Sequence, residues 1–175
     1  KIDISDFKDN THIEIIKNIL QKMEFNFSNK ALNILSHRNL KNISYEKNQI
    51  QLHFDEKWIF NDYIKKFINI EPAENELINF IKEIVKKKEK KLIITTGMNL
   101  PNKINKIENE LNKLKISLHK NLDFLELEKI TSQSKVLISC HGAISHVAAA
   151  YNIKQIDIID KTYNYSRWTN HFRNY

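Results

Sequence analysis

The chain has 175 residues and a formal net charge of +7, with 28 Lys and Arg residues against 21 Asp and Glu residues. This length is enough for one domain with a sizeable core, or for one domain and a fragment of another. No apolar run approaches the roughly 18 residues that a membrane-spanning helix needs, and no signal-peptide pattern is present. The single cysteine, Cys140, excludes an intrachain disulfide and fits a reducing cytoplasm.

Lysine supplies nearly all of the positive charge, because arginine occurs only at Arg38, Arg167 and Arg173. The lysines are scattered along the predicted helices. A nucleic-acid interface instead gathers arginine and aromatic residues on one face, so the pattern argues against a nucleic-acid partner. A lysine excess is compatible with weak attraction to an anionic membrane surface, and we expect contact with the inner membrane surface to be peripheral.

Helical and strand-like periodicities alternate along the chain. In the first half the expected elements are an amphipathic helix over 11–24, a short helix near 30–35, a strand over 49–54, a polar turn over 55–57, helical structure over 58–70 and a helix over 71–88. In the second half they are a strand over 91–95, a helix over 101–114, a short strand over 116–118, a helix over 123–132 capped by Asp123, a strand over 135–139, a helix over 143–151 and a strand over 155–159.

Strands that alternate with helices of this length predict βαβ units, and therefore an α/β fold with a doubly wound, Rossmann-like parallel sheet. The alternation starts near residue 48. We therefore expect residues 1–46 to be the end and linker of a preceding domain, and residues 47–175 to be the Rossmann-like domain, truncated at its end. The chain starts at Lys1 rather than at methionine, which indicates a piece of a longer product.

The two glycines, Gly97 and Gly142, each follow a predicted buried strand. Glycine suits positions where the backbone turns tightly or approaches something closely, so these turns are candidate sites. In the strand order 3-2-1-4-5, the first and fourth strands are neighbours, and their carboxyl ends face one crevice where such sheets bind ligands. That crevice would collect the following residues: His53, Asp55, Glu56, Lys57, Cys140, His141, Gly142, Ala143, Ile144, Ser145 and His146.

The start of the helix at Ala143 predicts an anion site, because the first N–H groups of a helix have no partner within it and lie at its positive end. Lys57 adds a mobile positive charge from the opposite wall. A diphosphate suits this combination better than a neutral ligand does. The alternative to an anion site is that every βαβ unit needs a tight turn at this position, and that Lys57 is one solvated lysine among many.

The sequence gives weaker support to a metal site and to a cysteine nucleophile. Four histidines (His53, His119, His141 and His146) fall near predicted strand ends, but their spacing matches no familiar metal-ligand motif, and we expect no metal. Adjacent residues of an extended segment point apart, so Cys140 beside His141 favours a buried thiol over a nucleophile. Residues 163–175 form a tail rich in aromatic residues. We expect Trp168 in this tail to pack on the edge of the sheet; in the alternative, the tail lines the crevice and Arg167 faces an anion.

The segment VLISCHGAISHVAAAYNIKQIDIID resembles the donor-binding region of the heptosyltransferase family of GT-B glycosyltransferases. The family has a strand, a D-T-G-x-x-H turn and a small-residue helix. His146 matches the family histidine, and His141, Gly142 and Ala143 fall on its Asp, Thr and Gly. The segment LHFDEKW resembles the family's first-strand turn, where Lys57 takes the place of a phosphate-contacting lysine. The segment IITTGMNLP, with Thr96 and Gly97, is similar to the strand before the nucleoside-contacting loop.

The resemblance covers about residues 48–160. It implies the carboxyl-terminal, donor-binding domain of an enzyme that transfers a sugar from a nucleoside diphosphate to a cell-surface glycan or lipid acceptor. It further implies that residues 1–46 end an acceptor-type domain, and that the catalytic carboxylate lies outside this chain, which would be inactive alone. Lys57 would stabilise charge on the leaving nucleotide, with no cofactor. A non-catalytic nucleotide- or partner-binding module and a nucleotide-sugar epimerase are the alternatives.

Overall fold

A computed structural model describes residues 12–25, 47–54, 73–86, 91–98, 100 and 102–159. Several predicted features lie outside these residues: the helices near 30–35 and over 58–70, the polar turn over 55–57 and the aromatic tail with Arg167 and Trp168.

The described residues form helices and strands that match the predicted elements, with ends displaced by at most three residues. The helices are α1 (His12–Lys22), α4 (Glu74–Lys86), α5 (Asn102–Lys113), α6 (Phe124–Ser132) and α7 (Ala143–Ala150). The strands are β1 (Gln49–Phe54), β2 (Lys91–Thr96), β3 (Ser117–His119), β4 (Ser134–Cys140) and β5 (Lys154–Ile158). Cys140, which directly follows the predicted strand over 135–139, is the last residue of β4.

The five strands form one parallel sheet in the order β3-β2-β1-β4-β5, so the predicted order is confirmed. Strand β1 is central: Leu52 is paired with Ile94 of β2 and with Ile138 of β4. The chain adds β2 and β3 on one side of β1, then returns to add β4 and β5 on the other. The direction of winding therefore reverses between β1 and β4, which is the topological switch point of a Rossmann-like sheet.

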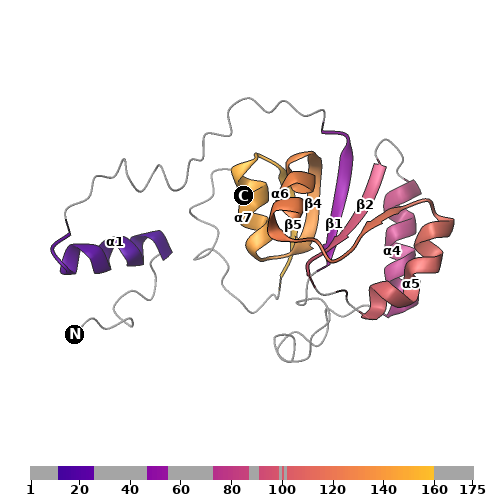
Figure 1. Ribbon diagram of the computed structural model, residues 1–175, viewed down its shortest axis with the longest axis horizontal. Helices are drawn as coiled ribbons and strands as arrows, with labels where there is room; N and C mark the ends of the chain where they lie inside the picture. The colour runs from indigo at the N-terminus through magenta and orange to yellow at the C-terminus, as the bar shows by residue number, and fades with distance from the viewer. Residues whose placement is uncertain are drawn as a thin grey trace.

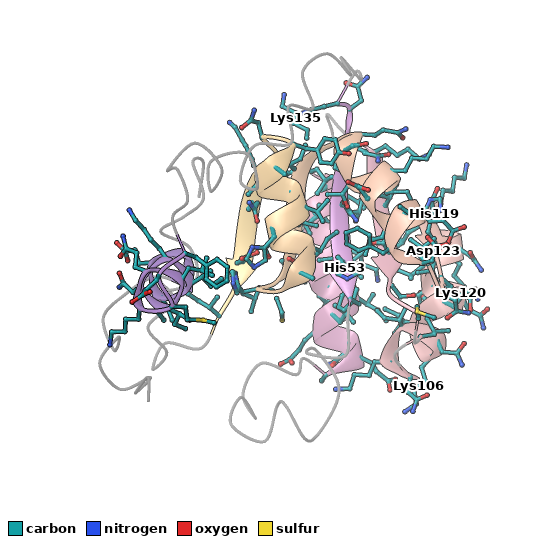
Figure 2. The ribbon with its side chains drawn as sticks, turned by 60° about the vertical axis from the view of Figure 1, so that its left-hand side comes forward. His53, Lys106, His119, Lys120, Asp123 and Lys135 are labelled. Atoms are coloured by element: carbon teal, nitrogen blue, oxygen red, sulfur yellow. The ribbon has the colours of Figure 1, made fainter. Side chains whose placement is uncertain are left out.

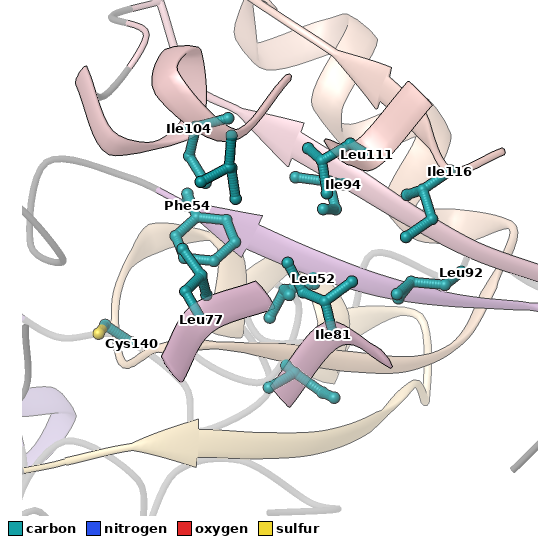
Figure 3. Packing of buried hydrophobic residues seen from close by; sticks show 12 residues of the cluster. Leu52, Phe54, Leu77, Ile81, Leu92, Ile94, Ile104, Leu111, Ile116 and Cys140 are labelled. Carbon is teal, nitrogen blue, oxygen red and sulfur yellow. The ribbon is translucent and has the colours of Figure 1, made fainter. Parts of the chain in front are cut away.

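One face of the sheet is apolar and is covered by α4 and α5 (Figures 1 and 3). Alternate strand residues point to this face because successive side chains of a strand alternate between its two sides. The buried cluster contains Leu52, Phe54, Leu77, Ile81, Leu92, Ile94, Ile104, Ile107, Leu111, Ile116, Ile138 and Cys140. Burial of this size supplies the main driving force for folding.

Helices α6 and α7 lie together on the opposite side of the sheet (Figure 1). The apolar cluster beneath them is smaller and contains Leu127, Leu137, Ile144, Ala148 and Ile153. Ala148 is fully buried, and its small side chain lets α7 approach the sheet closely. The remaining strand positions on this face are largely polar.

The expected cap of α6 is confirmed. The Asp123 side chain accepts a hydrogen bond from the Glu126 amide at 2.8 Å, and the Glu126 side chain accepts one from the Asp123 amide at 3.0 Å. This reciprocal pair is a capping box, which satisfies two N–H groups that the first turn leaves without helical partners.

Neither glycine has a backbone conformation that requires glycine. Neither has a positive φ; Gly142 is extended, with φ −173°, and a Cβ placed on Gly97 would meet nothing within 4 Å. The left-handed conformation is taken instead by Glu24, Lys115 and Asn152, which follow α1, α5 and α7, and by Asn121 after β3. Sequence position after a strand therefore marks a turn but does not show that glycine is required there.

The helix ends at Glu24, Lys115 and Asn152 share one hydrogen-bond geometry, the Schellman motif. After α5, Ile116 N–H donates to the Leu111 carbonyl and Lys115 N–H donates to the Asn112 carbonyl, both at 3.0 Å. After α7, Ile153 N–H donates to the Ala148 carbonyl at 2.9 Å. The motif turns the chain sharply from helix to strand, so α5 leads directly into β3 and α7 into β5.

Among the helices of the described ranges, none is both long enough and apolar enough to cross a membrane.

Candidate functional site at the carboxyl edge of the sheet

A row of polar side chains crosses the sheet near its carboxyl edge, on the face that α6 and α7 cover. Thr95 of β2 is paired with His53 of β1, and Ser139 of β4 with Asp157 of β5. Leu52 is paired with Ile138, so the next residues along, His53 and Ser139, lie side by side across the switch point. His119 of β3 is paired with Thr95 and extends the row, but it lies on the exposed rim, away from His53 (Figure 2).

The β1–β2 half of this row is a buried hydrogen-bond network. Gln51 Nε2 donates to Thr95 Oγ1 at 3.0 Å, and His53 Nδ1 lies 3.0 Å from the same oxygen. Behind them, Ser134 Oγ lies 3.2 Å from Gln51 Oε1. Gln51, Thr95 and Ser134 are fully buried, and His53 is 3% exposed. Buried polar groups are tolerated only when they are hydrogen-bonded, so these four side chains fix one another's positions.

The β4–β5 half of the row is built around a carboxylate. Asp157 Oδ2 lies 2.8 Å from His141 Nδ1, and Asp157 Oδ1 accepts from Ser145 Oγ at 3.1 Å and from Ser139 Oγ at 3.4 Å. The side chains of His141 and Asp157 are 9% and 4% exposed. Three residues from the end of β4 and the start of α7 thus meet one carboxylate of β5.

The start of α7, predicted to bind an anion, is partly engaged by the protein itself. Ser145 N–H donates to the Gly142 carbonyl at 3.0 Å, and Gly142 N–H donates to Ser145 Oγ at 3.2 Å. The Ala143 and Ile144 amides are the first two of the helix, where no intrahelical acceptor exists. Ile144 packs its side chain into the cluster under α7, so only its backbone is suited to a ligand.

His146 lies in the first turn of α7, and its ring centroid is 5.8 Å from that of His141. It is half-buried. Two of the predicted site histidines are therefore brought together at the β4–α7 turn, and His53 lies on the neighbouring strand.

Thr96 and Gly97 have a structural connection that the sequence did not indicate. Thr96 Oγ1 accepts from the Asn121 amide at 3.1 Å and donates to the Gly97 carbonyl at 3.1 Å. Because Asn121 precedes α6, the buried Thr96 hydroxyl ties the end of β2 to the loop between β3 and α6. Its interactions in the structure are thus with backbone groups of the protein.

The predicted site residues Asp55, Glu56 and Lys57 lie outside the described residues. Cys140 is buried in the cluster under α4 and α5, on the face opposite to Asp157, which confirms that it is a core thiol pointing away from its neighbour. Over the described ranges, no three His, Cys, Asp or Glu side chains are grouped so as to hold a metal ion.

Sequence reasoning missed Asp157, Gln51 and Thr95. The signal for Asp157 was available, since a carboxylate between Ile156 and Ile158 in a predicted strand needs a partner if it is buried. The signal for Gln51 was its alternation with His53 along β1, which places both on one face.

Comparison of the chain with models of protein families and with curated proteins finds no match to either.

Proposed function

We propose that residues 47–175 are the carboxyl-terminal, donor-binding domain of a GT-B-type glycosyltransferase, and that this domain binds a nucleoside-diphosphate sugar. The parent enzyme would transfer the sugar to a cell-surface glycan or lipid acceptor, with inversion, as the heptosyltransferase resemblance implies. The acceptor and the catalytic carboxylate would belong to a preceding domain. The nucleotide sugar would be a cytoplasmic substrate, and contact with the membrane surface would be peripheral.

The observation that carries the proposal is the position of α7. It begins directly after β4, beside the central strand β1, where the winding of the parallel sheet reverses. Ligands of open α/β sheets bind outside the carboxyl ends of the strands at this point. The amino end of a helix in that place offers unpaired N–H groups and the positive end of the helix dipole to a phosphate.

In this proposal the diphosphate lies against the turn 141–146, where the Ala143 and Ile144 amides donate to it. Lys57, which follows β1 in the sequence, would stabilise the charge that develops on the departing nucleotide, because a cation beside that charge lowers the energy of a charge-separating transition state. His146 orients the turn or contacts the phosphate.

The buried carboxylate of Asp157 bears directly on this chemistry. A negative charge near the start of α7 would repel a diphosphate if it were uncompensated. In the structure its two oxygens face the His141 ring and two hydroxyl groups. These partners satisfy the carboxylate within the protein, and in this proposal the anionic ligand lies on the outer side of the turn.

The first test is calorimetric titration of the chain with ADP, UDP, GDP and CMP, without added metal. The proposal expects binding of at least one nucleotide at submillimolar to millimolar concentration, and the base that is preferred narrows the donor sugar. Failure of all four at millimolar concentration would refute it. Binding to the chain, with no glycosyl transfer by the longer protein that contains it, would instead favour a non-catalytic nucleotide-binding module.

A second arm separates phosphate recognition from general effects on the fold. Lys57→Ala should weaken nucleoside-diphosphate binding by about 1–3 kcal/mol, the range for a hydrogen bond to a charged group, and should leave binding of the bare nucleoside nearly unchanged. Lys135→Ala is the matched control, because Lys135 is an exposed lysine at the other end of the sheet from His53 (Figure 2). Equal losses for the nucleoside and the diphosphate would place the effect of Lys57 in the fold.

A further inference from the structure

Asp157 is an unusual residue for its position. It lies in β5, the edge strand, between Ile156 and Ile158, and its side chain is only 4% exposed. A carboxylate that is almost fully removed from water is costly unless charged or hydrogen-bonding partners compensate it. The partners of Asp157 therefore indicate what the buried charge is for.

Three side-chain partners of Asp157 come from a single segment, the β4–α7 connection. Ser139 is the residue before the last one of β4, His141 is in the turn, and Ser145 is in the first turn of α7. Ser145 in turn accepts a hydrogen bond from the Gly142 amide at 3.2 Å. One carboxylate thus fixes the strand end, the turn and the helix start together.

The chemistry of the carboxylate also determines where the His141 proton lies. An ionised carboxylate only accepts hydrogen bonds, so the contact of 2.8 Å requires a proton on His141 Nδ1. In the neutral ring the other nitrogen, Nε2, is then an acceptor. The partner of one ring nitrogen commonly fixes the tautomer and orientation of a functional histidine in this way.

We infer that Asp157 is the positioning residue of the β4–α7 turn: it holds His141 as the Nδ1–H tautomer and, through Ser145, orients the backbone amides at the start of α7. The expected effect on ligand affinity rests on the proposed nucleotide site. The expected tautomer of His141 is independent of that site. Asp157 itself touches no ligand in this account. A buried inward charge on an edge strand also discourages edge-to-edge pairing, but that role needs no contact with the turn.

The test reads the histidine ring directly. Long-range proton–nitrogen correlation spectra of the ¹⁵N-labelled chain are recorded at about pH 8.5, some two units above the reference histidine pKa. The His141 signals are assigned by their loss in His141→Gln. The wild-type ring should show the proton on Nδ1, and Asp157→Ala should remove this preference. Asp123→Ala is the matched control, since it deletes the capping carboxylate of α6 and should leave the His141 signals unchanged.

The same variants are titrated with the nucleotide that the wild-type chain binds best. Asp157→Ala should weaken its binding about fivefold to tenfold, which corresponds to about 1–1.4 kcal/mol, and Asp123→Ala less than twofold. A wild-type ring with its proton on Nε2, or identical His141 signals in wild type and Asp157→Ala, would overturn the inference. If Asp157→Ala does not fold, the wild-type tautomer alone decides. If no nucleotide binds but the tautomer is as expected, the proposed function fails and the positioning role stands.

Discussion

The two faces of the sheet are made from alternate residues of the same strands, yet they differ sharply in chemistry. In β1, Leu52 and Phe54 enter the apolar cluster under α4 and α5, whereas Gln51 and His53 enter a buried polar network on the face of α6 and α7. All four of these side chains are buried, so contact with solvent does not explain why the residues on one face are polar. Burying apolar area is favourable in proportion to the area, whereas a hydrogen bond between buried polar groups contributes only about 0.5–1.5 kcal/mol net. The comparison indicates that stability comes mainly from one face, and that the other holds the candidate site.

The largest expected effect is on the apolar face. Leu52→Ala should lower the free energy of unfolding by about 2–5 kcal/mol, because Leu52 is fully buried at the centre of the sheet and its removal leaves a cavity. Leu137→Ala is the matched change on the other face, where the cluster is smaller. Denaturant unfolding of the three proteins gives the values. A larger loss for Leu137→Ala than for Leu52→Ala would contradict the assignment of stability to the α4–α5 face.

A second prediction concerns the coupling within the polar network. Gln51→Leu and Thr95→Val should each lower the free energy of unfolding by about 1–3 kcal/mol, since each leaves a buried hydrogen-bonding group without its partner. The double variant should lose clearly less than the sum, because it removes both ends of the Gln51–Thr95 hydrogen bond.

A double-mutant cycle measured by denaturant unfolding checks this coupling. Leu52→Ala combined with Thr95→Val serves as the reference cycle, because Leu52 lies on the other face of the sheet. Strict additivity of the Gln51 and Thr95 changes would mean that the polar network contributes nothing as a unit.

The sequence was sufficient to predict the α/β class and the strand order, because these follow from the alternation of strands with helices and from runs such as Lys91–Thr96. Its local pattern gave no indication that the polar residues of β1 are buried. The pattern QIQLHF alternates polar and apolar residues, which is typical of a strand with one solvated face, but β1 is central and both of its faces are covered. Whether a polar position is buried depends on which helix covers it, and local periodicity contains no such information.

The sequence predicted the turn of the candidate site but not the carboxylate of Asp157 that holds the turn. The turn 141–146 was found because it follows a strand and starts a helix. Asp157 was missed because its role depends on a partner 16 residues earlier, at the end of the neighbouring strand. Such a pair becomes visible only when the register between β4 and β5 is known.

The smallest expected effect compares the helix ends that lead into strands on the two sides of the sheet. Lys115 follows α5, which covers the apolar face, and Asn152 follows α7, which covers the polar one; both have a positive φ, at 56° and 55°. A left-handed conformation costs a residue with a Cβ about 1–2 kcal/mol, while the greater freedom of glycine in the unfolded chain offsets about 0.5–1 kcal/mol of any gain. Lys115→Gly should therefore raise the free energy of unfolding by about 0.5–1 kcal/mol.

Asn152→Gly should raise it by less, because asparagine tolerates the left-handed region better than lysine does. Thermal unfolding of the two variants beside the wild type measures the difference, with Lys113→Gly as the control, since residue 113 is still within α5 and glycine there should destabilise the helix. Equal stabilisation by Lys115→Gly and Asn152→Gly would show that the backbone conformation alone sets the cost. A loss of stability in Lys115→Gly would mean that the side chain of Lys115 contributes more to the end of α5 than its strained backbone takes away.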